Sequence, residues 1–224
     1  MLGGLAFKLL CPSATRQEYF RENKDIDLIG RRENCRDVME TMETLGYKPR
    51  EVFNKLNMGR RLIYYDMPNK RRVDIFLDEF EMCHKFNFKD SLGPDSYTLP
   101  LTELVMTKLQ VVEKTEKEYL DLAAAFRDHE VTEGRGGIEG DRIADACSGD
   151  WGLYATFTKS LGALKAWVQS LGKDGSASVI NRIDRLAAMI ETKPKSLAWK
   201  LRARIGEKAR WYETPDPDSD SALV

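Results

Sequence analysis

Hydrophobic and polar residues alternate along parts of the N-terminal half of the chain with the two-residue period of a β-strand. Residues 25–29 read Asp-Ile-Asp-Leu-Ile, and a strand with this pattern places both carboxylates on one face. Residues 61–67 and 71–78 are two β-rich runs separated by Pro68-Asn69-Lys70, which predicts a hairpin. We therefore expect a small sheet in this half of the chain.

Helical periodicity surrounds these strands. The stretch 5–10, apolar except for Lys8, predicts the opening turns of a helix that ends at Pro12. Apolar residues spaced by three and four positions predict an amphipathic helix over 33–45, closed by Gly46 as its C-terminal cap.

From residue 100 onward the pattern predicts helices, interrupted by one Gly-rich stretch. The first helix is expected over 100–129, with Thr98 or Thr102 as its cap. Residues 132–140 read TEGRGGIEG, and because no strand is expected before them we interpret them as a linker or mobile loop rather than a phosphate cradle. Further helices are expected over 141–171, 176–191 and 193–212.

Together these elements predict an α+β fold in which a small mixed sheet packs on helices. We expect a first domain over residues 1–130 and a helical C-terminal domain over 141–212. The final stretch, 213–224, is acidic and rich in Pro and Ser, which predicts a disordered tail.

Composition narrows the classes of function. Lys and Arg number 35 and Asp and Glu 36, giving a net charge of -1, so any nucleic-acid binding must come from a local patch. The 4 cysteines are widely spaced without a CxxC pair, which favours reduced thiols over a zinc site or disulfides. No apolar run approaches the roughly 20 residues that span a bilayer, and no signal peptide is recognisable. We expect no membrane partner and a cytoplasmic location.

The most informative polar residues are three aspartates. Asp25 and Asp27 lie on one face of their strand, with Cα atoms roughly 7 Å apart. Asp74 lies in an apolar-flanked strand of the hairpin, and pairing of the two strands would bring it alongside. Converging carboxylates need a cation to offset their charge, and all-oxygen ligands favour Mg²⁺, with Mn²⁺ as a substitute. For an Asp-x-Asp pair alone, the solvent face of an edge strand is the commoner explanation.

Gly3 and Gly4 support the interpretation that the aspartates form a metal site. Two glycines just before a helix allow its backbone to approach a triphosphate, and the free N–H groups of a helix N-terminus suit anionic oxygens. A glycine pair alone is a weak signal, because most such pairs form turns.

Three segments together resemble a known superfamily. These are Gly3-Gly4-Leu5-Ala6, the run from Arg21 to Leu28 (RENKDIDL), and Val73-Asp74-Ile75-Phe76. Over about residues 2–126 the chain resembles the nucleotidyltransferase superfamily that includes DNA polymerase beta, and within it the AbiEii-like toxins of abortive-infection systems. The interval between the glycines and Asp25 is longer than is usual there, and Asn23 stands where Ser or Thr is common.

The resemblance implies a nucleotidyltransferase core and a role for each motif. Asp25 and Asp27 would bind the metal ions, and Asp74 would complete the site or act as a base toward the attacking hydroxyl. Gly3 and Gly4 would contact the triphosphate of ATP or another nucleotide. The implied reaction moves a nucleoside monophosphate to a hydroxyl group of RNA, protein or a small molecule.

Three further residues match motifs of the family. Lys108, in the Leu-x-x-x-Lys-Leu motif of the 100–129 helix, would neutralise phosphate charge, with a solvated helix lysine as the alternative. Arg21 would do the same or brace Asp25 and Asp27. Asp121 corresponds to a further acidic motif, with a surface residue or helix ion pair as the alternative.

The remaining candidates concern partners. The basic segment 193–212 contains Trp199, Trp211 and Tyr212 and could bind an RNA acceptor by stacking, although packing of these rings against the domain is the favoured explanation. His84 and His129 lack a nucleophile elbow, which disfavours nucleophilic hydrolysis. The rival to an enzyme is an inactive nucleotide-binding module, or one half of a toxin-antitoxin pair that binds an antitoxin.

Overall fold

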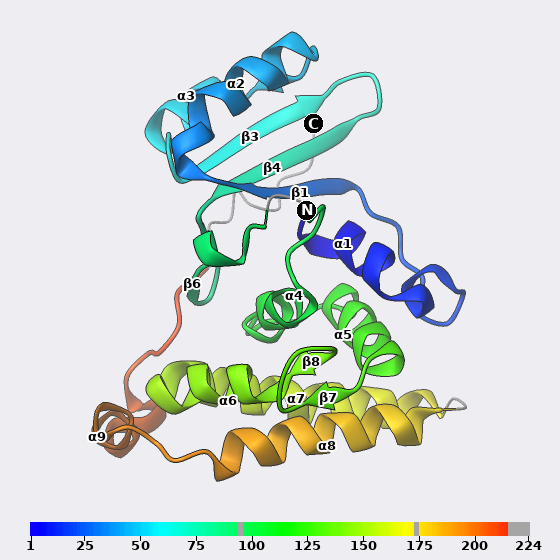
Figure 1. Ribbon diagram of the computed structural model, residues 1–224, viewed down its shortest axis with the longest axis vertical. Coiled ribbons are helices and arrows are strands. Elements are labelled where there is room, and N and C mark those ends of the chain that lie inside the picture. Colours follow the sequence, from blue (N-terminus) through cyan, green and yellow to red (C-terminus); the bar gives the residue numbers. More distant parts are fainter. Residues whose placement is uncertain (94–95, 173–174, 215–224) are drawn as a thin grey trace.

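The computed structural model describes residues 1–93, 96–172 and 175–214. It places a small sheet at one end of the long axis and a layer of helices at the other, with the N-terminal helix between them (Figure 1). The four main strands are β1 (Asp25–Gly30), β2 (Lys48–Pro49), β3 (Arg61–Asp66) and β4 (Arg71–Leu77). Their order is β1-β4-β3-β2, with β1 parallel to β4 and the other pairs antiparallel. The predicted α+β class with a small mixed sheet is confirmed.

Smaller strand pairs and the helices complete the fold. The short strands are β5 (Glu79–Glu81), β6 (Lys85–Asn87), β7 (Val131–Thr132) and β8 (Ile138–Glu139). The α-helices are α1 (Gly3–Leu10), α2 (Cys35–Thr44), α3 (Glu51–Leu56), α4 (Leu101–Leu109), α5 (Glu116–Asp128), α6 (Gly140–Gly149), α7 (Trp151–Leu171), α8 (Ser176–Thr192) and α9 (Leu197–Ile205). The 3₁₀ turns are η1 (Pro12–Thr15), η2 (Arg32–Asn34), η3 (Lys89–Ser91) and η4 (Gly206–Lys208).

The two faces of the sheet carry different side chains, as strand alternation requires. One face packs against α2 through buried apolar residues such as Leu62, Tyr64 and Ile75. On the other face Phe76 belongs to the main core shared with α1, α4 and α5. Asp74 is two residues before Phe76 and therefore lies on this second face, toward the helices.

The predicted helix over 100–129 is wrong as a single element. It ends after Leu109, and α5 begins after Thr115, which forms a capping box with Glu118. Neither predicted cap holds: the N-cap of α4 is Pro100, and Thr102 Oγ1 accepts a hydrogen bond from the Glu139 N–H at 3.0 Å.

Caps also divide the C-terminal helices. The predicted helix 141–171 is two helices, because Asp150 accepts from the Leu153 N–H at 3.1 Å and starts α7 anew. The basic helix expected over 193–212 covers only α9, which Ser196 caps and Gly206 ends with a φ of 59°. Within the Gly-rich stretch, β8 pairs in parallel with β7.

One apolar core connects the two predicted domains. It runs from Phe7 on α1 through Leu122 on α5 to Leu186 on α8. The division into 1–130 and 141–212 stays a prediction. Of the predicted tail 213–224, residues 215–224 lie outside the described residues. The four cysteines are free and buried, and none of the described helices is long and apolar enough to cross a membrane.

Candidate active site at the start of the first helix

The glycine pair lies directly against the first aspartate strand. The Leu2 N–H donates to the Asp27 carbonyl at 3.0 Å, and this bridge aligns the chain start with β1. A Cβ atom on Gly3, whose φ is 67°, would lie 2.0 Å from Asp27 Oδ2, and one on Gly4 would lie 1.9 Å from Arg21 Nη2. Only glycine permits this approach. The long interval between the glycines and Asp25 therefore does not separate the two motifs in space.

The third predicted aspartate is brought beside the first strand but is already paired. In the parallel ladder Asp27 lies opposite Asp74. The buried Asp74 carboxylate accepts from Arg61 Nε at 2.8 Å and from Arg72 Nη2 at 2.9 Å. Asp25, at the first position of β1, is exposed. The structure thus unites Asp27 and Asp74 and leaves Asp25 at the rim.

Asp27 differs from Asp74 in how its carboxylate is paired. No hydrogen bond from the described residues reaches its carboxylate, and its pKa is raised to about 6. Burial is the main cause and the charge of Asp74 the second, while Lys108 and Arg21 oppose the shift. A partly buried carboxylate in this condition is stabilised by a cation or by a proton.

Two of the predicted phosphate-binding residues form a buried ion-pair cluster. Arg21 binds the Asp121 carboxylate with two hydrogen bonds of 2.8 Å, and Lys108 Nζ lies 3.0 Å from Asp121 Oδ2. Glu118 Oε1 lies 3.6 Å from the same ammonium. Burial alone would raise the pKa of Asp121, but the two cations outweigh it and lower that pKa. A solvated Lys108 and a surface position for Asp121 are therefore wrong: Asp121 holds both cations near Asp27.

Three neighbours were not among the predicted site residues. Asn23 Nδ2 would lie 2.1 Å from a Cβ on Gly4, and its Oδ1 is buried without a hydrogen-bond partner. Arg72 could have been identified from the sequence, because it precedes Asp74 by two residues and so shares its face. Arg61 could not, because its place beside Asp74 depends on the register of the hairpin.

Few oxygen atoms at the first aspartate strand are available to a bound cation. Among residues 1–93, 96–172 and 175–214, no three acidic, His or Cys side chains form a ready metal cluster. Asp74 is shared by two guanidinium groups, which neutralise it. Gly3 packs directly against the Asp27 carboxylate. That carboxylate accepts no hydrogen bond from the described residues, and neither does the buried Oδ1 of Asn23. These oxygens are therefore the ones that a bound group could contact.

The aromatic residues of the basic segment are turned inward. Trp199 packs edge-on against Tyr154 with ring centroids 5.1 Å apart. Trp211 Nε1 donates to Thr156 Oγ1 at 3.0 Å. These two rings contribute to packing, so base stacking on them would require the segment to open.

Comparisons with protein-family models, curated proteins and solved structures returned no match to this chain. The functional assignment therefore depends on the geometry of the site.

Proposed function

We propose that the chain is a metal-dependent nucleotidyltransferase that moves a nucleoside monophosphate from a nucleoside triphosphate, such as ATP, to an acceptor hydroxyl. One observation carries the proposal. The Gly3-Gly4 backbone at the start of α1 closes on Asp27, and Asp27 lies opposite Asp74 in the sheet. Motifs that are distant in the sequence are thus adjacent, and a bound triphosphate would take the place that the side chains of Asp27 and Arg21 occupy against the glycines.

Each element has a distinct role in this reaction. Gly3 and Gly4 present backbone N–H groups at a helix N-terminus, where phosphate oxygens bind favourably. Lys108 and Arg21, both held by Asp121, supply positive charge beside the phosphates. Asp25 and Asp27 would hold Mg²⁺ or Mn²⁺, which offsets the charge of the polyphosphate. The acceptor oxygen attacks the α-phosphorus, the bond to the β-phosphate oxygen breaks, and pyrophosphate leaves.

Asp74 would act after its ion pairs rearrange. Arg61 and Arg72 hold its carboxylate in place by hydrogen bonds. When a triphosphate competes for those cations, the carboxylate becomes available to the metal or to the proton of the acceptor hydroxyl.

The same ion pairs support a second candidate function, a nucleotide-binding or toxin-antitoxin interaction module without turnover. If Arg61 and Arg72 retain Asp74 in the bound state, the site has only the Asp25 and Asp27 carboxylates for cations. Such a site binds a nucleotide without positioning the acceptor.

A labelling experiment distinguishes the two functions. The protein is incubated with Mg²⁺, each α-labelled triphosphate in turn, and total RNA, whole protein or small-molecule extract as acceptor. We expect label transfer, and its loss in the double variant Asp25→Ala, Asp27→Ala. The control is Asp37→Ala, which removes an exposed carboxylate of α2 remote from the site.

The outcomes separate cleanly. Triphosphate binding without transfer to any acceptor would favour the interaction module. A folded protein that binds neither Mg²⁺ nor any triphosphate would refute both functions.

A further inference from the structure

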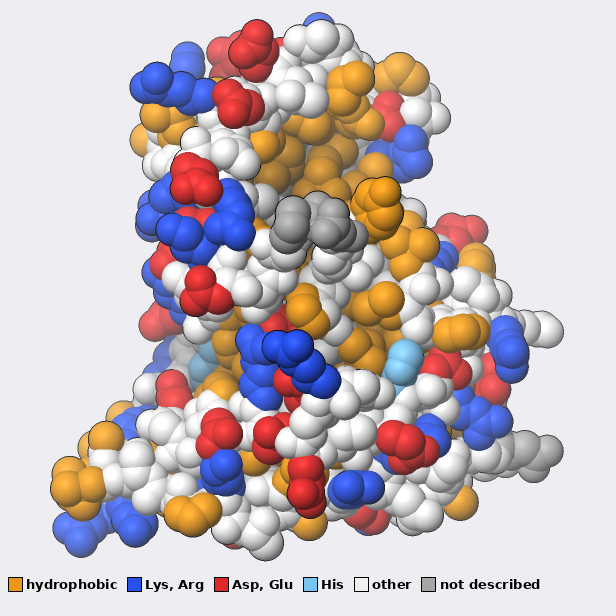
Figure 2. All heavy atoms as spheres, viewed as in Figure 1, with side chains coloured by type: hydrophobic (Ala, Val, Ile, Leu, Met, Phe, Trp, Pro, Cys, Tyr) orange, Lys and Arg blue, Asp and Glu red, His pale blue; other side chains and the backbone are white. Residues whose placement is uncertain are grey.

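A small cavity lies between α5, α7 and the segment that follows α9. Its volume is about 150 Å³, which is enough for several water molecules or one small organic molecule. Its walls carry two ammonium groups, two hydroxyl groups and two aromatic rings, those of Lys114, Lys159, Thr156, Ser160, Tyr119 and Trp211. Acidic and basic side chains are interspersed over the helical layer seen in Figure 2, whereas none of the described residues that line this cavity is acidic.

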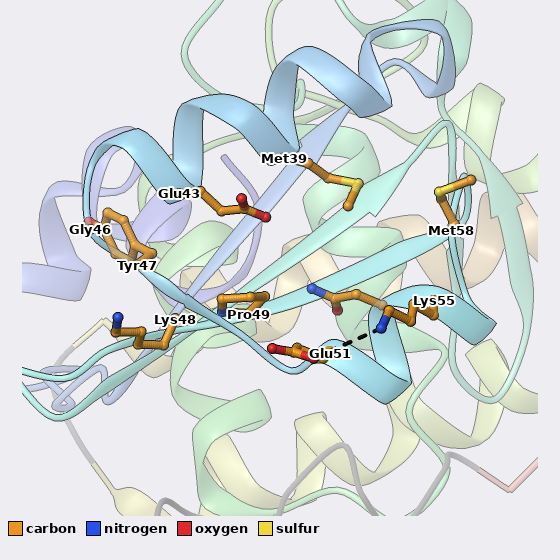
Figure 3. Close-up of a pocket in the computed structure, with 10 residues that line it drawn as sticks. Met39, Glu43, Gly46, Tyr47, Lys48, Pro49, Glu51, Lys55 and Met58 are labelled. Carbon is orange, nitrogen blue, oxygen red and sulfur yellow. Dashed lines mark ion pairs between the residues drawn. The ribbon is translucent and has the colours of Figure 1, made fainter.

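The larger groove between α2 and α3 has a different charge. Its volume is about 460 Å³, and two glutamates, Glu43 and Glu51, line it together with two lysines, Lys48 and Lys55 (Figure 3). Glu51 and Lys55 already form an ion pair with each other at 3.9 Å. The balanced charge of this groove favours neither sign of ligand, whereas the small cavity favours an anion.

Lys114 is the more buried of the two cations in the small cavity. Its ammonium donates to the Leu109 carbonyl at 3.1 Å, to the Val111 carbonyl and to Ser160 Oγ. These acceptors carry no net charge. The hydrogen bonds therefore hold the ammonium in place and leave its positive charge unbalanced.

No carboxylate of the described residues neutralises that charge by direct pairing. Burial lowers the pKa of Lys114 to about 8, although the charges of Glu118 and Cys83 act to raise it. Glu118 pairs instead with Lys108, at 3.6 Å, and the charge of Lys108 lowers the pKa of Lys114 further. A partly buried ammonium in this condition is stabilised by an anion beside it.

An anion can reach Lys114 without leaving a carbonyl group unpaired. The Leu109 carbonyl also accepts from Ser160 Oγ at 2.6 Å, so it keeps a donor when Lys114 turns one N–H toward the cavity. Lys159 supplies a second cation at the edge of the cavity, where its side chain is 55% exposed. It pairs with the exposed Glu207 at 2.7 Å, and an exposed ion pair of this kind is readily exchanged for another.

The aromatic walls are fixed from outside the cavity. Trp211 Nε1 donates to Thr156 Oγ1, and Tyr119 stacks on Trp167 with ring centroids 5.5 Å apart and planes 14° apart. Walls that are already in place favour a ligand with a flat apolar part, because little side-chain freedom is lost on binding. A phosphate ion presents no flat apolar face to these rings.

We propose that this cavity binds a small planar carboxylate, whose oxygens contact Lys114 and Lys159 and whose apolar part lies against Tyr119 and Trp211. The site contains none of the aspartates of the candidate active site, and the proposal does not depend on the transfer reaction. For a probe of the size of benzoate, the expected dissociation constant is on the order of 1 mM.

Isothermal titration calorimetry of the full chain with benzoate tests the proposal. Benzamide has the same shape without the charge and should bind at least about tenfold more weakly. Ala163→Phe adds a ring at an exposed position in the cavity wall and should abolish benzoate binding. The matched control Ala166→Phe changes an exposed residue of the same helix outside the cavity, and should bind as the unaltered chain does.

Three lysine variants test the role of charge. Lys114→Met and Lys159→Met should each weaken benzoate binding at least about tenfold. Lys165→Met is the control on the same helix, because its ammonium pairs with Asp184 outside the cavity. Circular dichroism checks that each variant is folded, and if Lys114→Met is not, Lys159→Met and Ala163→Phe still decide the result.

Proton uptake shows whether the anion meets Lys114. About half of these amines are neutral at pH 8, so an anion that raises the pKa of Lys114 should draw up to about half a proton from the buffer. Titrations at pH 8 in two buffers with different heats of ionisation measure this uptake, which should vanish at pH 6. Its absence at pH 8 would overturn the contact with Lys114.

Four other results would overturn the proposal. They are undetectable benzoate binding at tens of millimolar, equal binding of benzamide, binding that survives Ala163→Phe, and equal binding of inorganic phosphate. The first three would remove the anion site, and the last would show that the rings do not contact the ligand.

Discussion

Asp27 and Asp121 are two partly or fully buried carboxylates at one site, and their surroundings are opposite. Asp121 is bound by Arg21 and Lys108, which lower its pKa despite burial. Asp27 has no donor among the described residues, and burial together with Asp74 raises its pKa to about 6. A fully paired carboxylate fixes the positions of its cationic neighbours. An unpaired buried carboxylate is destabilised, and binding of a cation or a proton to it is therefore favourable. In the proposed function Asp121 is therefore a positioning residue, and Asp27 is the residue that would contact the bound group.

The largest effect is expected from Asp121→Ala. Its removal leaves Arg21 and Lys108 close together, each only 13% exposed at the side chain and without its main partner. Breaking a buried ion pair from one side costs about 3–5 kcal/mol. Urea denaturation measures the loss in the free energy of unfolding. A loss below about 1 kcal/mol would show that solvent or other groups compensate the two cations.

Asp27→Asn should change the free energy of unfolding in the opposite direction and stabilise the protein. Because folding raises the pKa of Asp27 from 3.8 to about 6, its ionisation weakens the fold by up to about 3 kcal/mol at pH 7. The contribution of Asp27 to the free energy of unfolding is therefore fully present below the unfolded pKa of about 4. It is lost as pH rises through the folded pKa of about 6. Asp27→Asn should be the more stable protein at pH 7 and equal to wild type below pH 4.

Denaturant titrations at several pH values measure this difference. Asp66→Asn is the control, since the pKa of Asp66 is lowered by Asn69 and Arg71 and its replacement should destabilise near neutral pH. Equal stability of Asp27→Asn and wild type at pH 7 would contradict the unpaired state of Asp27.

A smaller effect is expected from Gly3→Ala. The φ of 67° costs a non-glycine residue about 1–2 kcal/mol, and the added Cβ displaces the Asp27 carboxylate, which lies 2.0 Å away. Thermal unfolding should show the destabilisation, and triphosphate binding should be lost with it. Gly162→Ala is the control, because its Cβ would meet nothing within 4 Å. Retention of triphosphate binding in Gly3→Ala would remove the glycine loop from the site.

The sequence predicted local features of this site better than distant contacts. Strand alternation was enough to place Asp25 and Asp27 on one face and to predict the hairpin. The break between α4 and α5 was missed because apolar periodicity continues across it, although Thr115 and Glu118 have capping-box spacing. The contacts of Asp121 with Arg21 depend on how α5 packs beside the chain before β1, and a single sequence does not encode that distance locally.

The smallest effect on the free energy of unfolding is expected from the binding of Mg²⁺. If the cation binds only the folded chain, at several times its dissociation constant it should raise the free energy of unfolding by about 1 kcal/mol. The gain should shrink from pH 7 to pH 5, because protons compete for a carboxylate whose pKa is about 6. The double variant Asp25→Ala, Asp27→Ala should show no gain, whereas Asp121→Asn, if folded, should retain part of it because Asp121 is not a ligand. An equal gain in the double variant would place the cation elsewhere and leave Asp27 a carboxylate without a partner.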